Sequence, residues 1–292
     1  MPPQPIERPD QPPVPPQGHW LIRATRTVFV DHALPYRMQV SVDRMMRRLG
    51  QVEKTVHLDG YSVRVRRLTC DELFVQTMLV KHEYTSPGFD IQPTDTVIDI
   101  GGNIGTFALH AARCAPRGRV LSFEPDSVNF RLLERNLRSN GCNTVTAVRA
   151  AVAGTPGDVT LFCASEGGFH SIRAGRGRRT ERTEVVPAVT LQHIFDDYQI
   201  HRCHFLKLDC EGAEYEILYA LPPAYFQRID RIAMEYHGVD DPVVRRRDAD
   251  ALAAHLESHG FQIDAYVAFV GYSAGHLKAS NRARATSISR DR

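Results

Sequence analysis

The sequence has no long apolar run and no cysteine framework, and these absences exclude several classes of protein. No stretch approaches the roughly 18 apolar residues of a transmembrane helix, and the N-terminus lacks the basic and apolar regions of a signal peptide. The six cysteines form no C-x-x-C pair and no zinc-binding spacing. We therefore expect a cytoplasmic protein with reduced thiols and no membrane contact.

An excess of charge of either sign is also missing. The formal net charge of the 292 residues is +2, so the chain as a whole has no strong electrostatic attraction to nucleic acid. Hydrophobic residues make up 42% and charged residues 24% of the chain, as is usual for a globular protein. The length fits one large domain or one domain with an extension.

Composition divides the chain into four parts. Residues 1–19 form a leader in which proline is frequent and apolar side chains are few, so we expect it to be disordered. Residues 20–92 have too little regular pattern for a domain of their own and are interpreted as an N-terminal flank or lid. Residues 93–272 carry the main domain, and residues 273–292, which are rich in basic side chains, are interpreted as a frayed tail.

The stretch Thr96–Gly105 (TVIDIGGNIG) organises the main domain. The β-branched residues at its start are typical of a buried parallel strand, three glycines follow, and Thr106–Arg113 has a helical pattern. A strand, a glycine turn and a helix in this order present a ligand with backbone N–H groups and a helix N-terminus. Glu83 and Tyr84 lie shortly before the strand, and we expect them to reach the same ligand.

Strands and helices alternate along the main domain, which predicts an α/β fold with a doubly wound, mostly parallel sheet. Strands are predicted at Arg119–Phe123, Val145–Val152, Asp158–Phe162, His204–Leu208, Ile229–Met234 and Phe261–Val270, and helices at Ser127–Ser139, Tyr215–Ala220 and Pro242–His259. In the flank we expect a strand or hairpin at His57–Arg66 and a helix at Asp71–Val80 that Asp71 caps. Ala164–Glu184 is interpreted as a long, flexible and basic insertion.

Four of the predicted strands end in acidic residues. Asp99, Glu124 and Asp209 each stand at the end of a strand, and Glu235 is followed by His237 at the end of another. Ligands of open α/β sheets bind at the carboxyl ends of the strands. These side chains therefore predict one polar site.

Two of these acids indicate which nucleotide is bound. Glu124 stands 19 residues after Gly105, a spacing at which a carboxylate accepts both hydroxyls of a ribose, although it would also suit a cap of the helix at Ser127. The dinucleotide fingerprint G-x-G-x-x-G fails in either register of the turn. Asp99 would repel a pyrophosphate but suits the cationic amine and sulfonium of S-adenosylmethionine. The charge pattern therefore favours this methyl donor over NAD.

Six segments in order resemble the FkbM-type class I S-adenosylmethionine-dependent methyltransferases: VIDIGGNIGTFAL, LSFEPD, NFRLLERNLRSN, AAVAG, FLKLDCEGAEYEIL and IAMEYH. The resemblance covers residues 95–272. It implies a Rossmann-like sheet of seven strands with the last strand antiparallel, a donor-binding domain at residues 93–272, and methyl transfer to a hydroxyl oxygen.

The resemblance also implies roles for matching positions. Gly101, Asn103 and Gly105 are expected to wrap the methionine and ribose parts of the donor, and Glu124 to hold the ribose. Pro125 and Ala151 are expected to flank the adenine, and Asp209 to lie near the donor amino group or the acceptor. The complete predicted donor site is Glu83, Tyr84, Asp99, Gly101, Asn103, Gly105, Thr106, Glu124, Pro125, Ala151 and Asp209.

Removal of the acceptor proton calls for a base near the carboxyl edge of the sheet. His237 is the first candidate because imidazole titrates near neutral pH. Asp209 is the second and Glu211 the third, since Glu211 equally suits the N-terminus of the helix that follows. Asp209, Glu235 and His237 together suit Mg²⁺ as an alternative, but they supply few carboxylates, and we favour transfer without a metal.

The acceptor cannot be inherited from the resemblance. Arginines 173, 176, 178, 179 and 182 suit an anionic or carrier-bound acceptor, or form a solvated loop, and His170 beside them is a weaker catalytic candidate. We expect a small-molecule O-methyltransferase of natural-product or sugar biosynthesis, as a monomer or an oligomer. The alternatives are a nucleic-acid methyltransferase, whose phosphate contacts the basic insertion and tail would supply, and a non-catalytic relative that binds the nucleoside.

Overall fold

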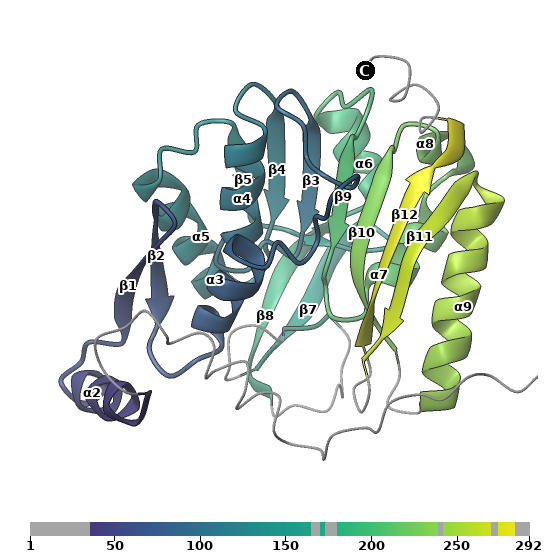
Figure 1. Cartoon of the computed structure of the whole chain (residues 1–292). Coiled ribbons are helices and arrows are strands. Elements are labelled where there is room, and N and C mark those ends of the chain that lie inside the picture. The colour runs from purple at the N-terminus through teal and green to yellow at the C-terminus, as the bar shows by residue number, and fades with distance from the viewer. Residues whose placement is uncertain (1–35, 165–169, 173–179, 239–241, 270–273, 284–292) are drawn as a thin grey trace, which may run out of the picture.

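The computed structural model describes residues 36–164, 170–172, 180–238, 242–269 and 274–283, and its main body is a sheet of seven strands with helices on both faces (Figure 1). Across the sheet the order is β11 (Phe261–Ala268), β12 (Ala274–Asn281), β10 (Arg231–His237), β9 (Phe205–Leu208), β3 (Thr96–Ile100), β4 (Arg119–Phe123) and β5 (Val145–Val148). Strands β10, β9, β3, β4 and β5 are parallel, and β12 is antiparallel to both neighbours. The α/β class and the mostly parallel sheet with an antiparallel last strand are therefore confirmed.

Alternating side chains of the central strands enter cores on opposite faces of the sheet. Ile98 and Ile100 of β3 pack with the helices of one face, and Val97 packs with Phe107 and its neighbours on the other. The first face carries α6 (Leu191–Asp197), α7 (Glu214–Ala220), α8 (Pro223–Phe226) and α9 (Pro242–Ser258), and the second carries α3 (Asp71–Leu79), α4 (Thr106–Cys114) and α5 (Ser127–Ser139). Because both faces are covered, the parallel strands consist mainly of apolar residues.

A second sheet of three strands stands beside the first and consists of β6 (Ala151–Val152), β8 (Thr180–Val189) and β7 (Gly157–Ala164). The prediction of a single strand at Val145–Val152 is therefore wrong. This range contains two strands, β5 and β6, which belong to different sheets. The prediction of a flexible insertion is also wrong for residues 180–184, because they are part of β8 and pair with β7. Residues 165–169 and 173–179 of that insertion lie outside the described residues.

The N-terminal flank consists of α2 (Tyr36–Arg48), the hairpin β1 (Glu53–Leu58) and β2 (Tyr61–Arg66), and α3. Two asparagines, one in α5 and one at its C-cap, hold the hairpin against the main domain. Asn136 accepts from the backbone N–H of Arg64 (2.7 Å) and donates to the carbonyls of Arg64 and Ile104, and Asn140 exchanges the same pair of bonds with Ser62. The flank is thus fixed along α5 by side chains that each satisfy both groups of a strand residue.

The start of α3 differs from the prediction. Its N-cap position is Cys70, and Asp71 is the first helical residue. The fully buried carboxylate of Asp71 instead forms an ion pair with Arg66 of the hairpin (2.7 Å). The predicted cap by Asp71 is therefore wrong, because an arginine five residues earlier takes its side chain.

The C-terminal segment is the largest departure from the prediction. Residues from Gly275 onward were expected to be a frayed tail, but Ala274–Asn281 form β12, which lies between β10 and β11. Gly275 has no room for a side chain, because a Cβ there would lie 2.2 Å from the hydroxyl oxygen of Tyr236. The basic composition of the segment concealed its alternating pattern, in which every second residue is buried. Residues 1–35, with the predicted leader, and 284–292 lie outside the described residues.

No helix in the described part of the chain is long and apolar enough to cross a membrane.

The position of β12 predicts a stability effect at Leu277, which is 0% exposed. Replacement by alanine (Leu277→Ala) removes a core side chain between two neighbouring strands, and we expect a loss of about 2–5 kcal/mol in the free energy of unfolding. Urea denaturation followed by circular dichroism measures this loss. Val267→Ala, at a position of β11 that is 54% exposed, is the control and should change stability by less than about 0.5 kcal/mol. Equal, small effects at both positions would contradict a core strand.

Candidate functional site

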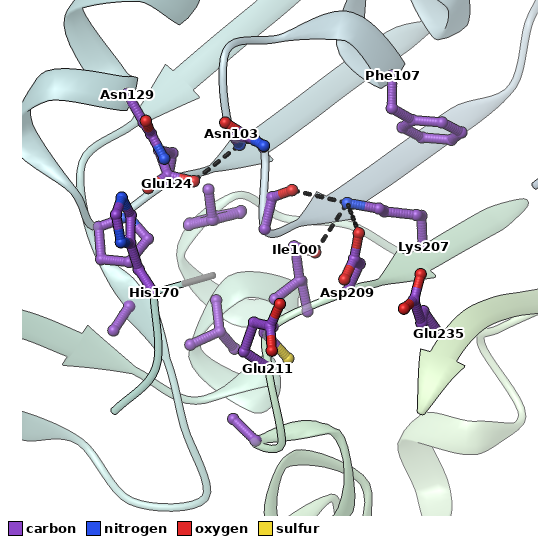
Figure 2. A pocket seen from close by; sticks show the side chains of 18 of the residues that line it. Ile100, Asn103, Phe107, Glu124, Asn129, His170, Lys207, Asp209, Glu211 and Glu235 are labelled. Carbon is purple, nitrogen blue, oxygen red and sulfur yellow. Dashed lines mark hydrogen bonds and ion pairs between the residues drawn. The ribbon is translucent and has the colours of Figure 1, made fainter. Parts of the chain in front are cut away.

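A pocket lies at the carboxyl ends of β3, β4, β9 and β10, the edge at which open α/β sheets bind ligands (Figure 2). Among the residues predicted to bind the donor or to act in catalysis, those that line it are Gly101, Asn103, Thr106, Glu124, Pro125, Ala151, Asp209 and Glu211. Those that do not are Glu83, Tyr84, Asp99, Gly105 and His237. The pocket therefore brings together residues from four separate stretches of the sequence, and the roles assigned to them stay predictions.

The turn after β3 requires glycine at two positions. Gly101 has φ +85°, and a Cβ on it would lie 1.8 Å from the backbone oxygen of Asp209. Gly105 has φ +89° at the N-terminus of α4. The left-handed backbone folds the turn against the end of β9, which brings the loops of two neighbouring strands to the same side of the pocket.

Glu124 is buried at the end of β4 with its carboxylate at the turn. One oxygen accepts the backbone N–H of Asn103 (2.7 Å) and the other that of Asp126 (2.8 Å). Burial outweighs these bonds and raises the pKa of Glu124 to about 7. Asp126, whose side chain accepts from Val128 and Asn129, caps α5, so the alternative that Glu124 caps this helix is wrong.

Lys207 of β9 is a buried cation that the sequence interpretation missed. Its ammonium donates to the carbonyls of Gly101 (2.7 Å) and Ile100 (3.3 Å) and forms an ion pair with Asp99 (3.1 Å). Asp99 also accepts from Ser122 (2.7 Å) and is fully buried. The argument that a free Asp99 charge selects the ligand is therefore wrong, because Lys207 pairs with that charge inside the protein.

Asp209 follows β9 and lines the pocket, where its carboxylate accepts from the hydroxyl of Tyr84 (2.9 Å). Burial raises the pKa of Asp209, although Lys207, at 3.9 Å, acts in the opposite direction. Tyr84 is buried behind this carboxylate, and Glu83 forms an ion pair with His276 (3.6 Å). Tyr84 thus holds an acid of the pocket wall, and neither Glu83 nor Tyr84 lines the pocket.

His237 is buried among three carboxylates. Its ring nitrogens lie 3.0 Å from Glu214, 3.4 Å from Glu235 and 3.6 Å from Glu211. Burial alone would lower the pKa of His237, but Glu211 and Glu214 outweigh it and raise the pKa well above its usual value. An imidazole that is already protonated cannot accept a proton near neutral pH. The geometry therefore does not suit His237 as the base.

Glu211 lines the pocket and has an unusual backbone. Its φ of +54° lies in the left-handed region, which a glutamate rarely adopts and which is concentrated at functional sites. Burial raises the pKa of Glu211 to about 7, against the opposing effect of His237. A carboxylate with this pKa exchanges protons readily near neutral pH.

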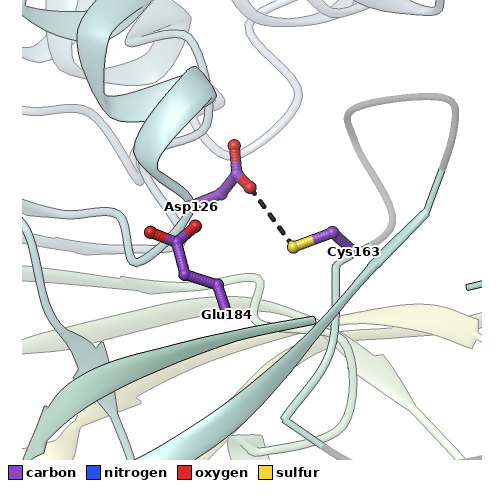
Figure 3. A group of neighbouring side chains, drawn as sticks. All are labelled: Asp126, Cys163 and Glu184. Atoms are coloured by element: carbon purple, nitrogen blue, oxygen red, sulfur yellow. Dashed lines mark hydrogen bonds between the residues drawn. The ribbon is translucent and has the colours of Figure 1, made fainter. Parts of the chain in front are cut away.

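The three residues considered as alternative Mg²⁺ ligands, Asp209, Glu235 and His237, all form contacts with other side chains. Burial alone would raise the pKa of Glu235, but its bonds to His237 and His276 hold the pKa well below its usual range. Among the described residues, three ligand atoms within 4.8 Å of one another occur at Asp126, Cys163 and Glu184 (Figure 3). There, Arg182 already forms ion pairs with both carboxylates, so a guanidinium occupies the position of a cation.

The basic insertion contributes little that the structure describes. Arginines 173, 176, 178 and 179 lie outside the described residues, and Arg182 is held by Asp126 and Glu184. His170 lines the pocket, and its Nδ1 accepts from the backbone N–H of Ala164 (3.0 Å). Burial lowers the pKa of His170.

Several pocket residues were not predicted from the sequence, although one of them gave a signal. Lys207 interrupts the apolar strand FLKL, and a lysine in a buried strand indicates a buried ion pair. Phe74 and Met78 of α3, Phe107 of α4 and Asn129 of α5 also line the pocket. Their positions depend on how distant helices pack together, and no local pattern marks them.

Comparison with known proteins finds relatives of this chain among methyltransferases. The family model described as "Methyltransferase FkbM domain" matches residues 99–263, which is more than half of the chain. The chain is 27% identical over 225 residues to the 31-O-demethyl-FK506 methyltransferase FkbM of Streptomyces tacrolimicus, covering 66% of this chain and 80% of that one. It is 27% identical over 156 residues to the hexuronic acid methyltransferase AglP of Haloferax volcanii, covering 52% and 60%.

A third relative is much longer. The chain is 27% identical over 238 residues to the AMB antimetabolite synthetase AmbE of Pseudomonas aeruginosa, and the match covers 70% of this chain but 11% of that protein. The chain thus corresponds to a small part of that synthetase.

The environment of His237 predicts that its imidazole stays charged above neutral pH. Because the folded pKa is raised above the unfolded value of about 6.5, the stabilisation from this charge is complete below the unfolded pKa and is lost as pH rises through the folded pKa. ¹⁵N NMR of histidine-labelled protein, with His237→Gln to assign the signal, measures the charge. A ring that titrates near 6.5 would contradict this arrangement and restore His237 as a candidate base.

Proposed function

The chain belongs to the FkbM methyltransferase domain family, and on this premise we propose that it transfers a methyl group from S-adenosylmethionine to a hydroxyl oxygen of a small molecule, such as a natural product or a sugar. The observation that carries the proposal is the pocket in which buried Glu124, beside the glycine turn of β3, faces the carboxylates of Asp209 and Glu211. The Glu124 carboxylate suits the hydroxyls of a ribose. The carboxylate of Asp209 suits the ammonium of the donor, and that of Glu211 suits acceptance of a proton.

The residues around Glu124 fit the adenosine part of the donor. Each Glu124 oxygen accepts one backbone N–H, which leaves lone pairs for the ribose hydroxyls. The side-chain oxygen of Asn103 is buried without a hydrogen-bond partner, and a ligand hydroxyl or amine would satisfy it. Pro125, Ala151 and Leu161 add apolar surface to the lining, which suits the faces of an adenine ring.

The remaining residues would hold the donor and receive the proton. When bound, S-adenosylmethionine supplies a methyl group on a sulfonium, whose departure requires no proton. Asp209 would pair with the donor ammonium, and the glycine turn at Gly101 packs against the backbone of Asp209, which keeps this acid beside the turn. The protein then contributes mainly alignment of the acceptor oxygen with the methyl group.

We assign the base to Glu211 in place of His237. Glu211 lines the pocket, has a pKa of about 7, and lies 3.6 Å from the His237 imidazole. An adjacent imidazolium orients the carboxylate, and the acceptor hydroxyl would donate its proton to it. Asp209 is the second candidate, but its carboxylate accepts from Tyr84 and faces the donor amine in this scheme.

The choice of an oxygen is supported by the name of one relative, a 31-O-demethyl-FK506 methyltransferase. Another relative is named a hexuronic acid methyltransferase, which supports a sugar as an acceptor class but does not specify the methylated atom. A carboxylate base is also appropriate to a hydroxyl, because the alcohol proton must leave as the new C–O bond forms.

The donor assignment predicts pH-dependent binding of S-adenosylhomocysteine. Ribose hydroxyls donate to the ionised form of Glu124, so affinity should be constant above pH 7 and fall by up to about tenfold for each pH unit below it. Isothermal titration calorimetry over this range measures the change, with NAD as the comparison ligand. We expect S-adenosylmethionine to bind as well and NAD not to bind.

The matched variant for this measurement is Glu124→Gln, which keeps the side-chain size and cannot titrate. It should bind S-adenosylhomocysteine more weakly and without the loss below pH 7. If neither sulfur ligand binds the unaltered protein, the proposed function is wrong, and binding of NAD alone would point to a dehydrogenase.

The base assignment predicts a specific kinetic defect in Glu211→Gln. The rate constant kcat should fall by about 10² to 10⁴, the usual contribution of a general base, while the Kd of S-adenosylhomocysteine stays within about twofold. Transfer of a labelled methyl group to an acceptor found by mass spectrometry measures the rate, and Glu257→Gln on the exposed side of α9 is the control. A variant with normal kcat would move the base to Asp209, and loss of activity in EDTA that Mg²⁺ restores would overturn transfer without a metal.

A further inference from the structure

We propose that the acceptor carries a protonated amine near the hydroxyl that is methylated. The inference rests on the proposed function, because it concerns the acceptor side of the same pocket. It starts from the charges of the pocket wall formed by the ends of β9 and β10.

Three carboxylates of this wall face the pocket, whereas the nearest cations are buried behind them. The side chains of Asp209, Glu211 and Glu235 all line the pocket and are 29%, 18% and 25% exposed (Figure 2). The side chains of Lys207 and His237 are only 3% and 8% exposed. The surface that a ligand meets is therefore negative.

The cations behind the wall are shared with other acids. Lys207 lies closer to Asp99 (3.1 Å) than to Asp209 (3.9 Å). His237 lies closer to Glu214 (3.0 Å) than to either acid of the wall. The third cation, His276, is shared between Glu83 and Glu235.

Six carboxylates thus share three cations, so the acids exceed the cations by up to three negative charges. Buried charges need partners. The ammonium of the donor would pair with one of them, Asp209, and the proton of the acceptor hydroxyl would neutralise a second, Glu211, during the reaction. The proposed reaction assigns no ligand group to the third, Glu235, whose ion pairs are with His237 and His276.

Glu235 is well placed to bind a cation of the acceptor. Its carboxylate is fixed by His237 (3.4 Å) and His276 (3.5 Å), which lie on different strands. Two imidazoles hold it in the ionised form, so it presents a permanent negative charge to the pocket. An ammonium bound there would stand on the same wall as Glu211, the acid that receives the hydroxyl proton.

The other lining residues favour a cationic acceptor over an anionic one. Among the described residues that line the pocket, Lys207 is the lysine or arginine, and its ammonium is already bonded to two backbone carbonyls and Asp99. Phe74 and Phe107 supply aromatic rings, whose faces attract a cation and not an anion. A carboxylate or phosphate of the acceptor would meet three acids and no available cation on this part of the surface.

Three pyranoses of the same size test the proposal. Glucosamine carries an ammonium, glucose is neutral, and glucuronic acid carries a carboxylate. Binding of each to the protein saturated with S-adenosylhomocysteine is measured by ligand-observed NMR. We expect glucosamine to bind about ten- to a hundredfold more tightly than glucose, the contribution of one charge-assisted hydrogen bond, and glucuronic acid to bind most weakly. Equal binding of the three, preference for glucuronic acid, or no binding up to the solubility limit would overturn the proposal.

Glu235→Gln identifies the side chain responsible. The variant should lose the preference for glucosamine over glucose and keep its affinity for S-adenosylhomocysteine, whereas Glu257→Gln, with the same change on the surface of α9, should keep both. A preference that survives in Glu235→Gln would also overturn the proposal. The sugar series is repeated without S-adenosylhomocysteine, so that failure of the donor to bind refutes the proposed function separately from the charge preference.

Discussion

The ion pair between Lys207 and Asp99 is the interaction on which the site depends. It joins β9 to β3, and the same ammonium bonds the carbonyls of Ile100 and Gly101, so it fixes the glycine turn relative to the central strands. A buried lysine is stable only with partners that compensate for its lost hydration. Since these partners are backbone groups of the turn, the turn and β9 hold each other in position, and the pocket forms between them.

A second consequence of this arrangement is a layering of charge. Lys207 and His237 lie behind Asp209, Glu211 and Glu235, so cations stabilise the acids from within while the acids face the pocket. The two ends of the pocket therefore differ. At one end Glu124 accepts from the backbone in an environment with apolar neighbours. At the other end acids with cations behind them form the wall, which suits proton transfer and the recognition of positive charge.

The part of the pocket proposed to bind the donor was predictable from the sequence as an arrangement of residues, because it depends on local order. A strand, a glycine turn and a helix follow one another without a break, and Glu124 ends the next strand, so Gly101, Asn103 and Glu124 are found in the pocket where the pattern predicts them. The acid at Asp99 was misread for the opposite reason. Its partner Lys207 is 108 residues away in the sequence, and no local pattern indicates that the two charges cancel.

The wall proposed to face the acceptor was not predictable, because it depends on pairing between distant strands. His237 was expected to be a free imidazole since it follows a predicted strand end, but Glu214 of α7 reaches it and keeps it charged. His276 belongs to a segment that its basic composition marked as a tail, yet as part of β12 it lies opposite Glu235 of β10 in the sheet and bonds its carboxylate. Placing β12 inside the sheet thus does more than complete the fold. It fixes Glu235, the acid of the wall to which the proposed cation of the acceptor is assigned, so under this proposal acceptor recognition would depend on a strand outside the local motifs that point to the donor pocket.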